Sequence, residues 1–501
     1  MRAALSKGLS REELVKLKAR VSRRHHLAKT PSNADILKVA TASEKKKLRQ
    51  LLLKKPTRSI SGVSVVAVMA RPWDCPHGKC SYCPRGSDAP QSYTGEEPAA
   101  LRARFNKFSA TNQVKNRLQQ LRETGHPTDK VELIIMGGTF PAQPVSYQKQ
   151  FVKDCLDAMS GKKTKTLAEA KKACETSKVR PIGITFETRP DYCKEKEIKR
   201  MLQLGATRVE LGVQNVYDSI YKKVNRGHTV LDVIESTKLM KDAGLKVLYH
   251  MMPGLPGSSL KKDLTGFKTI FSDQRFKPDM IKIYPTLVMP GTELYDDWKA
   301  GKYKPLTSIQ AAKLVSKIKQ IIPPWIRIMR VQRDIPANLI AEGVKKSNLR
   351  QLATANCKCI RCREVGHNKL KPENIEIKVQ KYNASGGVEY FISAEDFEKG
   401  VLVGYLRLRK TQTHDVGRAS RYRSSAPTRW LVRELHVYGV EVPIGEDEAT
   451  AYQHKGWGKK LLQKAEEIAD EKLYVLSGIG AKEYYRNRGY KDDGVYVVRY
   501  L

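Results

Sequence analysis

The chain has 501 residues, more than one ordinary hydrophobic core needs, which indicates two or three domains. Its 92 Lys and Arg residues outnumber its 52 Asp and Glu residues, giving a formal net charge of +40. A solvated surface explains a high charge content but not this imbalance, so we expect a nucleic-acid partner. An anionic membrane is the alternative, but the sequence has no apolar run near the roughly 18 residues of a spanning helix and no signal-peptide core. The nine cysteines fall largely in two groups and indicate metal sites in a reducing cytoplasm, so we expect a cytoplasmic protein without a membrane partner.

Residues 1–58 form a basic N-terminal region. They hold 17 Lys or Arg and four Asp or Glu residues, a net charge of +13. Apolar residues recur at helical spacing in Arg11–Arg20 and Ser43–Leu52, with basic residues between them. A flexible basic tail would have the same composition, but the spacing favours ordered helices that contact RNA.

Residues 59–345 alternate between short apolar runs and helical stretches, the pattern of repeated β/α units in a parallel sheet. Six units are too few for a closed eight-stranded barrel, so we expect a partial (β/α)6 barrel with the site at the carboxyl ends of its strands. The predicted strands are Val63–Ala70, Val131–Met136, Ile182–Glu187, Arg208–Val213, Val247–Met252 and Met280–Tyr284. The predicted helices are Ala99–Glu123, Val145–Met159, Lys194–Leu204, Val230–Ala243, Leu260–Phe271 and Ile309–Ile321.

Three cysteines follow the first predicted strand. Cys75, Cys80 and Cys83 have the spacing C-x4-C-x2-C. Three thiolates can hold three irons of a [4Fe–4S] cluster and leave the fourth iron open for a substrate or cofactor. A zinc knuckle with a distant fourth ligand is the alternative. The aromatic Tyr82 between the last two cysteines resembles radical S-adenosylmethionine (SAM) enzymes, although their usual spacing is C-x3-C-x2-C.

A second cysteine group lies in residues 346–372. Cys357, Cys359 and Cys362 are close enough in sequence to share one metal, and His367 is a nearby fourth ligand. A thiol elsewhere or a water could take that fourth place instead. We expect a linker with a structural zinc; reduced free thiols are the alternative.

Residues 373–501 have the pattern of a second α/β domain. The predicted strands are Ile375–Tyr382, Tyr390–Ala394, Leu402–Arg409, Trp430–Val437 and Leu473–Ile479. Between the last two lies Gln453-His-Lys-Gly-Trp-Gly-Lys459, where glycines at a helix start let the backbone approach a pyrophosphate. This loop resembles the acetyl-CoA loop of GNAT acetyltransferases, and Tyr484-Tyr-Arg-Asn-Arg-Gly-Tyr490 resembles the end of that fold.

Taken together, these motifs resemble the catalytic subunit family of Elongator. The resemblance spans roughly residues 60–501, and it also rests on five segments: Met136–Phe140, Glu187–Asp191, Glu210–Gln214, His250–Gly257 and Ile360–Val365. It implies a radical SAM barrel followed by a GNAT domain, with a [4Fe–4S] cluster, SAM and acetyl-CoA. It also implies conversion of the wobble uridine of tRNA, in the anticodon stem-loop, into 5-carboxymethyluridine.

The resemblance also assigns roles to residues. Gly137 and Gly138 would contact the methionine part of SAM. Four further candidates follow from their places on or at the ends of the predicted strands: Glu210 and Gln214 as polar contacts in the cavity, with His250 and Lys282, the latter a catalytic candidate. A lone His or Lys on a buried strand is usually paired for structural reasons, which is the alternative for the last two. The loop residues Gln453, His454, Lys455, Gly456, Trp457, Gly458 and Lys459 would bind acetyl-CoA. Tyr484 and Tyr485 sit where the family places an acid or a group that orients the thioester, and we favour Tyr485. Glu434 and His436 are further candidates for a general base.

Two other functions compete with this one. A protein lysine acetyltransferase with a structural iron–sulfur site would need no SAM, but its lysine-rich substrates suit an acidic enzyme. The second competing function is that of a basic RNA-binding scaffold, not an enzyme, whose cofactor pockets have degenerated. The intact motifs in both the barrel and the C-terminal domain count against it. Both a homodimer and a larger Elongator-like complex are compatible with the sequence.

Overall fold

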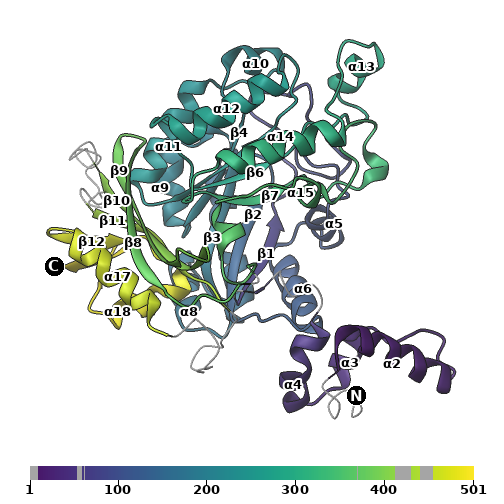
Figure 1. Ribbon diagram of the computed structural model, residues 1–501, viewed down its shortest axis with the longest axis vertical. Helices are drawn as coiled ribbons and strands as arrows, with labels where there is room; N and C mark the ends of the chain where they lie inside the picture. Colours follow the sequence, from purple (N-terminus) through teal and green to yellow (C-terminus); the bar gives the residue numbers. More distant parts are fainter. Residues whose placement is uncertain (1–8, 54–58, 61, 369, 412–429, 440–454) are drawn as a thin grey trace.

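A computed structural model describes residues 9–53, 59–60, 62–368, 370–411, 430–439 and 455–501. In Figure 1 the N-terminal helices lie at one end of the molecule, the barrel occupies the middle, and the C-terminal domain packs against one side of it. No helix among these residues is both long and apolar enough to cross a membrane.

The N-terminal region contains three described helices: α2 (Arg11–Arg24), α3 (Asn33–Val39) and α4 (Ala42–Leu52). They confirm the helices that we predicted there. Ser10 and Ser32 each cap the helix that follows them in a reciprocal capping box. The helices share a small leucine core made of Leu14, Leu37, Leu48 and Leu52. On α2 the basic residues Arg11, Lys16, Arg20, Arg23 and Arg24 are exposed.

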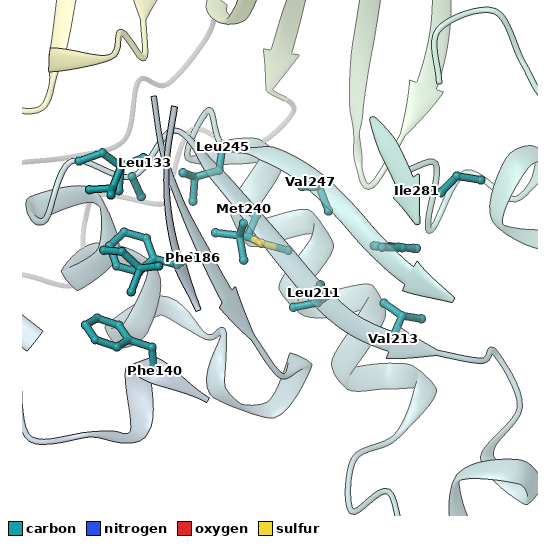
Figure 2. Close-up of a cluster of buried hydrophobic side chains, with 14 of the residues drawn as sticks. Leu133, Phe140, Phe186, Leu211, Val213, Met240, Leu245, Val247 and Ile281 are labelled. Carbon is teal, nitrogen blue, oxygen red and sulfur yellow. The ribbon is translucent and has the colours of Figure 1, made fainter. Parts of the chain in front are cut away.

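The barrel is a curled sheet of parallel strands in sequential order from β1 to β7. The strands are β1 (Val63–Met69), β2 (Lys130–Met136), β3 (Arg180–Thr188), β4 (Arg208–Gln214), β5 (Lys246–Met251), β6 (Met280–Ile283) and β7 (Arg327–Val331). The partial barrel is confirmed, with a seventh strand that the sequence did not reveal. Apolar residues on the outer face of the sheet, among them Leu133, Phe186 and Val247, pack under the helices (Figure 2).

The described helices of the barrel lie mostly on the outside of this sheet (Figure 1). They are α5 (Pro98–Phe105), α6 (Ala110–Glu123), α7 (Val145–Ser160), α8 (Leu167–Glu175), α9 (Glu195–Gln203), α10 (Asp218–Lys223), α11 (Val230–Asp242), α12 (Leu260–Ser272), α13 (Glu293–Lys299) and α14 (Ser308–Ile321). One long helix was wrongly predicted for Ala99–Glu123. It is broken because Lys107 and Phe108 adopt left-handed conformations, with φ of 48° and 55°, and Ser109 then caps α6. Short 3-10 turns, η2 (Phe140–Ala142) and η3 (Pro190–Tyr192), follow β2 and β3.

A connecting region follows β7. It contains the turn η4 (Ala337–Leu339) and two single-turn helices, α15 (Leu349–Leu352) and α16 (Ile360–Arg363). α16 contacts both β7 of the barrel and β10 of the second sheet. This region therefore joins the two domains, as expected of a linker, while its limits at 346 and 372 stay a prediction.

The C-terminal domain is a mixed sheet in the order β13-β14-β12-β11-β10-β9-β8. The strands are β8 (Glu376–Ala384), β9 (Gly387–Asp396), β10 (Val401–Thr411), β11 (Trp430–Val437), β12 (Lys472–Val475), β13 (Lys491–Asp493) and β14 (Tyr496–Tyr500). β11 and β12 are parallel and pair only over Trp430–Val432, so they separate toward their carboxyl ends. Helix α17 (Trp457–Ile468) packs on β9–β11, and the turn η5 (Ile479–Ala481) leads into α18 (Lys482–Arg486).

The second domain is seated against the amino ends of the barrel strands. Gly478 lies so close to β3 that a β-carbon there would be 2.0 Å from the carbonyl oxygen of Ile182. Arg433 of β11 donates to both carboxylate oxygens of Asp279, which directly precedes β6, at 2.6 and 2.9 Å. Arg433 and Asp279 are both buried. The contact is therefore a packed core that contains charges, rather than a mobile hinge.

Candidate active sites

One cavity of about 470 Å³ lies between the cysteine loop and the inner face of the barrel sheet. It brings together the predicted residues Cys75, Cys80, Cys83, Gly138, Glu210, Gln214, His250 and Lys282. Gly137 lies just beside it, with φ of +136°, a conformation that a side chain rarely tolerates. Residues from all seven barrel strands and from the loops after them therefore converge on one space.

The three cysteines differ in their surroundings. Cys83 is buried, and its Sγ accepts a hydrogen bond of 3.3 Å from the amide of Gln91. The Sγ of Cys80 lies 3.7 Å from Nη1 of Arg226 and 3.2 Å from Nε2 of His77. Burial raises the pKa of the Cys83 thiol to about 11, so in the absence of a metal this sulfur carries its proton.

These residues fit a four-iron cluster. The three sulfurs line a cavity large enough for a cofactor, and each has a polar neighbour of the kind that supports a metal-bound thiolate. They are not gathered within 4.8 Å of one another, as the ligands of a single ion would be. A cluster that binds each thiolate on a different iron accounts for this wider placement.

A second polar group faces the cysteines across the cavity. Glu210 is buried and accepts a hydrogen bond of 2.8 Å from Nε2 of His250, and its other close partner is the ammonium group of Lys282. Burial alone would raise the pKa of Glu210, but Lys282 and His250 hold it well below its usual value. The carboxylate is therefore charged, and Lys282 is its counter-ion. We find Lys282 in an ion pair, which suits binding and orientation of a ligand more directly than proton transfer.

Gln214 ends β4 in a left-handed conformation, with φ of +68°, which few non-glycine residues adopt. Its side-chain Oε1 is buried without a hydrogen-bond partner. A buried acceptor without a partner costs free energy unless a ligand donates to it. Gln214 is therefore a fitting contact for a cofactor or substrate in this cavity.

The linker cysteines form a separate, tighter group. The sulfurs of Cys357, Cys359 and Cys362 lie within 4.8 Å of one another, as the ligands of one ion do. The structure does not bring His367 into this group, because its Nδ1 contacts the carboxylate of Glu364 instead. Three thiolates are consistent with a zinc ion that has a fourth ligand elsewhere, and zinc here stays a prediction.

The predicted acetyl-CoA loop leads into α17. Gln453 and His454 lie outside the described residues. Gly456 is the N-cap of this 12-residue helix, with φ of +77° and open space around its missing β-carbon. Trp457 and Gly458 are half-buried, whereas Lys455 and Lys459 are exposed. Free backbone N–H groups at a helix start, flanked by lysines, suit a pyrophosphate.

The two adjacent tyrosines have different environments. The hydroxyl of Tyr484 faces the loop, because a β-carbon on Gly458 would lie 2.9 Å from it, and this hydroxyl is buried without a hydrogen-bond partner. Tyr485 is buried in the core of the domain, where its ring contacts the rings of Tyr484 and Tyr490. The structure therefore favours Tyr484 as the residue nearer to the acyl carrier, where the sequence favoured Tyr485.

The further base candidates face away from this loop. Glu434 binds Nε of Arg407 at 2.9 Å in the contact between the domains. The ring of His436 stacks between Tyr405 and Tyr438, and burial lowers its pKa to about 4. A carboxylate held by an arginine and an imidazole enclosed by rings are better explained as parts of the domain contact.

Sequence reasoning missed Gln91 and Arg226, which hold two of the cluster cysteines, and Tyr93, whose hydroxyl binds Glu187 at 2.5 Å. Gln91 and Tyr93 lie in the loop directly after the cysteines, which could have drawn attention to them. Arg226 lies in an exposed-looking polar segment, and only the fold brings it to Cys80.

Comparison with known proteins supports both sites. The radical SAM superfamily matches residues 74–264, and its C-terminal domain matches residues 278–359. The ELP3 N-terminal domain matches residues 4–60, and the GNAT acetyltransferase family matches residues 360–490. Membership of these two enzyme families implies a [4Fe–4S] cluster, SAM and acetyl-CoA.

Similarity to individual proteins extends over nearly the whole chain. A protein of Methanocaldococcus jannaschii called tRNA uridine(34) acetyltransferase is 50% identical, covering 99% of this chain and 95% of that protein. Human Elongator complex protein 3 is 42% identical, covering 98% and 93% respectively. The solved structure of Methanocaldococcus infernus Elp3 lacking its N-terminus matches with a TM-score of 0.77 and 45% identity, covering 88% of this chain and all of that one. With its radical SAM cavity and its GNAT acetyl-CoA loop, this chain belongs to the Elongator complex protein 3 family.

Proposed function

We propose that this protein is a tRNA uridine-34 carboxymethyl synthase, which uses SAM and acetyl-CoA to form 5-carboxymethyluridine at the wobble position. The observation that carries the proposal is the pairing of a three-cysteine cavity with an acetyl-CoA loop in a family whose members include proteins named for tRNA uridine(34). When bound, the cluster and SAM supply a 5′-deoxyadenosyl radical.

The net change replaces one hydrogen of uridine. The methyl carbon of acetyl-CoA bonds to C5 of the base, and one methyl hydrogen goes to the deoxyadenosyl group. The hydrogen on C5 leaves as a proton, and the electron left behind would return to the cluster, which would supply one electron for each SAM that is cleaved to methionine and the deoxyadenosyl group. Water cleaves the thioester. The product is a carboxymethyl group and free coenzyme A.

Residues of the cavity position the reactants. Cys75, Cys80 and Cys83 would hold the cluster, and the backbone at Gly137 and Gly138, which carries no side chains, would receive the amino-acid end of SAM. The Glu210 carboxylate, fixed by Lys282 and His250, offers acceptors to ribose hydroxyls or to the base. Because the base must leave the anticodon stack to enter such a cavity, tRNA is the expected macromolecular substrate.

Residues of the second domain position the acyl carrier. Backbone N–H groups at Gly456–Gly458 hold the pyrophosphate, and the hydroxyl of Tyr484 orients the thioester or protonates the departing thiolate. The net charge of +40 supports a polyanionic partner. We place the protein in the cytoplasm, with zinc in the linker, and a homodimer or larger assembly stays a prediction.

The test is anaerobic reconstitution with tRNA, SAM and acetyl-CoA labelled in the methyl carbon, followed by analysis of the nucleosides. We expect labelled 5-carboxymethyluridine and 5′-deoxyadenosine with the native protein. Cys80→Ser should form neither, while it still binds tRNA. Labelled acetyl groups on a lysine peptide, with no label in tRNA, would instead support a protein lysine acetyltransferase.

A further inference from the structure

A buried arginine lies beside the cluster cysteines, and no motif marks it. Arg226 is 7% exposed, and its Nη1 lies 3.7 Å from the Sγ of Cys80. Its Nη2 donates a hydrogen bond of 2.6 Å to the carbonyl oxygen of Gly212 at the end of β4. The backbone N–H of Arg226 is itself fixed by the carbonyl oxygen of Tyr221 at 2.9 Å. Both ends of this residue are therefore held in place.

The fold leaves room for this guanidinium group. A β-carbon on Gly212 would lie 2.7 Å from Nη2 of Arg226, so any side chain at 212 would displace it. The hydroxyl of Tyr221, whose carbonyl holds Arg226, donates in turn to the carbonyl oxygen of Val213 at 2.9 Å. Strand β4 and the loop after α10 therefore hold the guanidinium group of Arg226 next to Cys80.

The charge of Arg226 is not cancelled by the protein. Within the described part of the chain, no carboxylate forms an ion pair with it. Arg189, the other arginine near the cysteines, is by contrast paired with Asp191 at 2.8 Å. An arginine guanidinium is not deprotonated in proteins, so Arg226 keeps its full positive charge. A buried cation without a protein counter-ion is costly unless an anion binds beside it.

A cluster held by three thiolates is such an anion, and it becomes more negative by one charge when it takes up an electron. Hydrogen bonds to the sulfurs and nearby charges set the reduction potential of iron–sulfur clusters. Gln91 supplies a neutral hydrogen bond to Cys83, and Arg226 supplies a full positive charge beside Cys80. Both contacts are made to the cysteine sulfurs themselves.

We propose that Arg226 is a positioning residue that stabilises the reduced form of the cluster, and so makes it easier for a low-potential one-electron donor to reduce. The guanidinium acts through Cys80 and needs no contact with SAM, acetyl-CoA or tRNA. The proposal rests on the cluster alone and not on the carboxymethyl product, so it is tested without tRNA.

The experiment is an anaerobic redox titration of the iron-loaded protein with dithionite, followed by electron paramagnetic resonance of the reduced cluster. Arg226→Gln removes the charge and keeps a hydrogen-bond donor, and Gln91→Glu adds a negative charge at the other cysteine. At a fixed potential we expect each variant to have at least a tenfold lower ratio of reduced to oxidised cluster, a downward shift of about 59 mV for a one-electron couple. Arg226→Lys should keep most of the native ratio.

Two controls make the result decisive. Arg330→Gln changes an arginine that lines the same cavity but pairs with Asp334 at 2.6 Å, so it should shift the ratio much less. Iron and sulfide analysis shows whether each variant carries a full cluster. The proposal is overturned if Arg226→Gln loads a full cluster and keeps the native ratio. It is also overturned if Arg226→Gln and Arg226→Lys both fail to load a cluster, because Arg226 would then serve only to fold the site.

Discussion

Asp279 is the point at which the two domains are joined most strongly, and its replacement by Asn gives the sharpest test of how they are coupled. Its carboxylate accepts two hydrogen bonds from Arg433 and one of 2.8 Å from the backbone N–H of Val247. Arg407 and Lys241 lie 3.6 and 3.7 Å from the same carboxylate. Asn keeps the shape of the side chain but removes the charge that three buried cations face.

The expected loss is large because no water replaces the missing charge. Breaking a buried ion pair by removing one partner typically costs about 3–5 kcal/mol. Asp279 and Arg433 are both fully buried, so we expect Asp279→Asn to lower the free energy of unfolding by about 3 kcal/mol. Glu467→Gln, which alters an exposed pair with Lys464 on α17, should cost less than about 0.5 kcal/mol.

The pH dependence has a defined sign. Burial alone would raise the pKa of Asp279, but Arg433, Lys241 and Arg407 together hold it well below its usual value. A depressed pKa in the folded state stabilises the protein above the unfolded value of about 3.9, and this contribution is lost as the pH falls below it. The difference in the free energy of unfolding between the native protein and Asp279→Asn should therefore be largest at pH 7 and should become smaller below about pH 4.

Urea unfolding, followed by a signal from each domain, measures these effects. In the native protein we expect the domains to unfold together, and in Asp279→Asn the C-terminal domain should unfold first. The double variant Asp279→Asn with Arg433→Met should lose clearly less free energy of unfolding than the two single variants lose together, because the two residues contact each other. A loss below about 1 kcal/mol with additive single effects would refute this account of the interface.

Three further predictions concern the sites. Cys357→Ser combined with Cys359→Ser should release one zinc per chain and lower the melting temperature, because structural zinc stabilises only the folded state; a fully iron-loaded native protein without zinc would contradict this. Deletion of residues 1–58, with a net charge of +13, should weaken tRNA binding and reduce its salt slope by roughly 0.9 for each phosphate no longer neutralised, whereas an unchanged slope would place the tRNA contacts on the barrel. Gly456→Glu should weaken acetyl-CoA binding at least about tenfold. Tyr484→Phe should slow acetyl-CoA turnover about 100-fold, with binding retained. Equal turnover in Tyr484→Phe and the native protein would mean that Tyr485 is the residue that acts on acetyl-CoA.

The sequence was sufficient for the elements with strong local patterns. Strand β11 was predicted at its observed limits because Trp430–Val437 begins with three apolar residues after a polar stretch and continues with apolar residues at alternate positions. Strand β7 was missed because the apolar and basic residues of Arg327–Val331 give no recognisable strand pattern. The break between α5 and α6 was missed because neither glycine nor proline marks Lys107 or Phe108.

The residues of the candidate sites also differ in whether the sequence alone could predict them. The cluster cysteines and the acetyl-CoA loop were predictable, because a metal and a pyrophosphate each need several groups at close sequence spacing. The contact of Arg226 with Cys80 was not predictable, because the two residues are 146 positions apart in the sequence. The pairing of His367 with Glu364 was overlooked, although the two residues are only three positions apart. The choice between Tyr484 and Tyr485 likewise needed the position of α18 against the loop.

The seating of the second domain limits how the protein can be divided for study. Three arginines of that domain donate hydrogen bonds to residues of the barrel: Arg407, Arg409 and Arg433. A C-terminal fragment produced alone would expose three arginines and the apolar surface around Leu431 and Ile479, which is buried in the barrel core of the whole chain. Such a fragment would aggregate or fold differently, so an acetyl-transfer activity measured on it would not represent the intact enzyme.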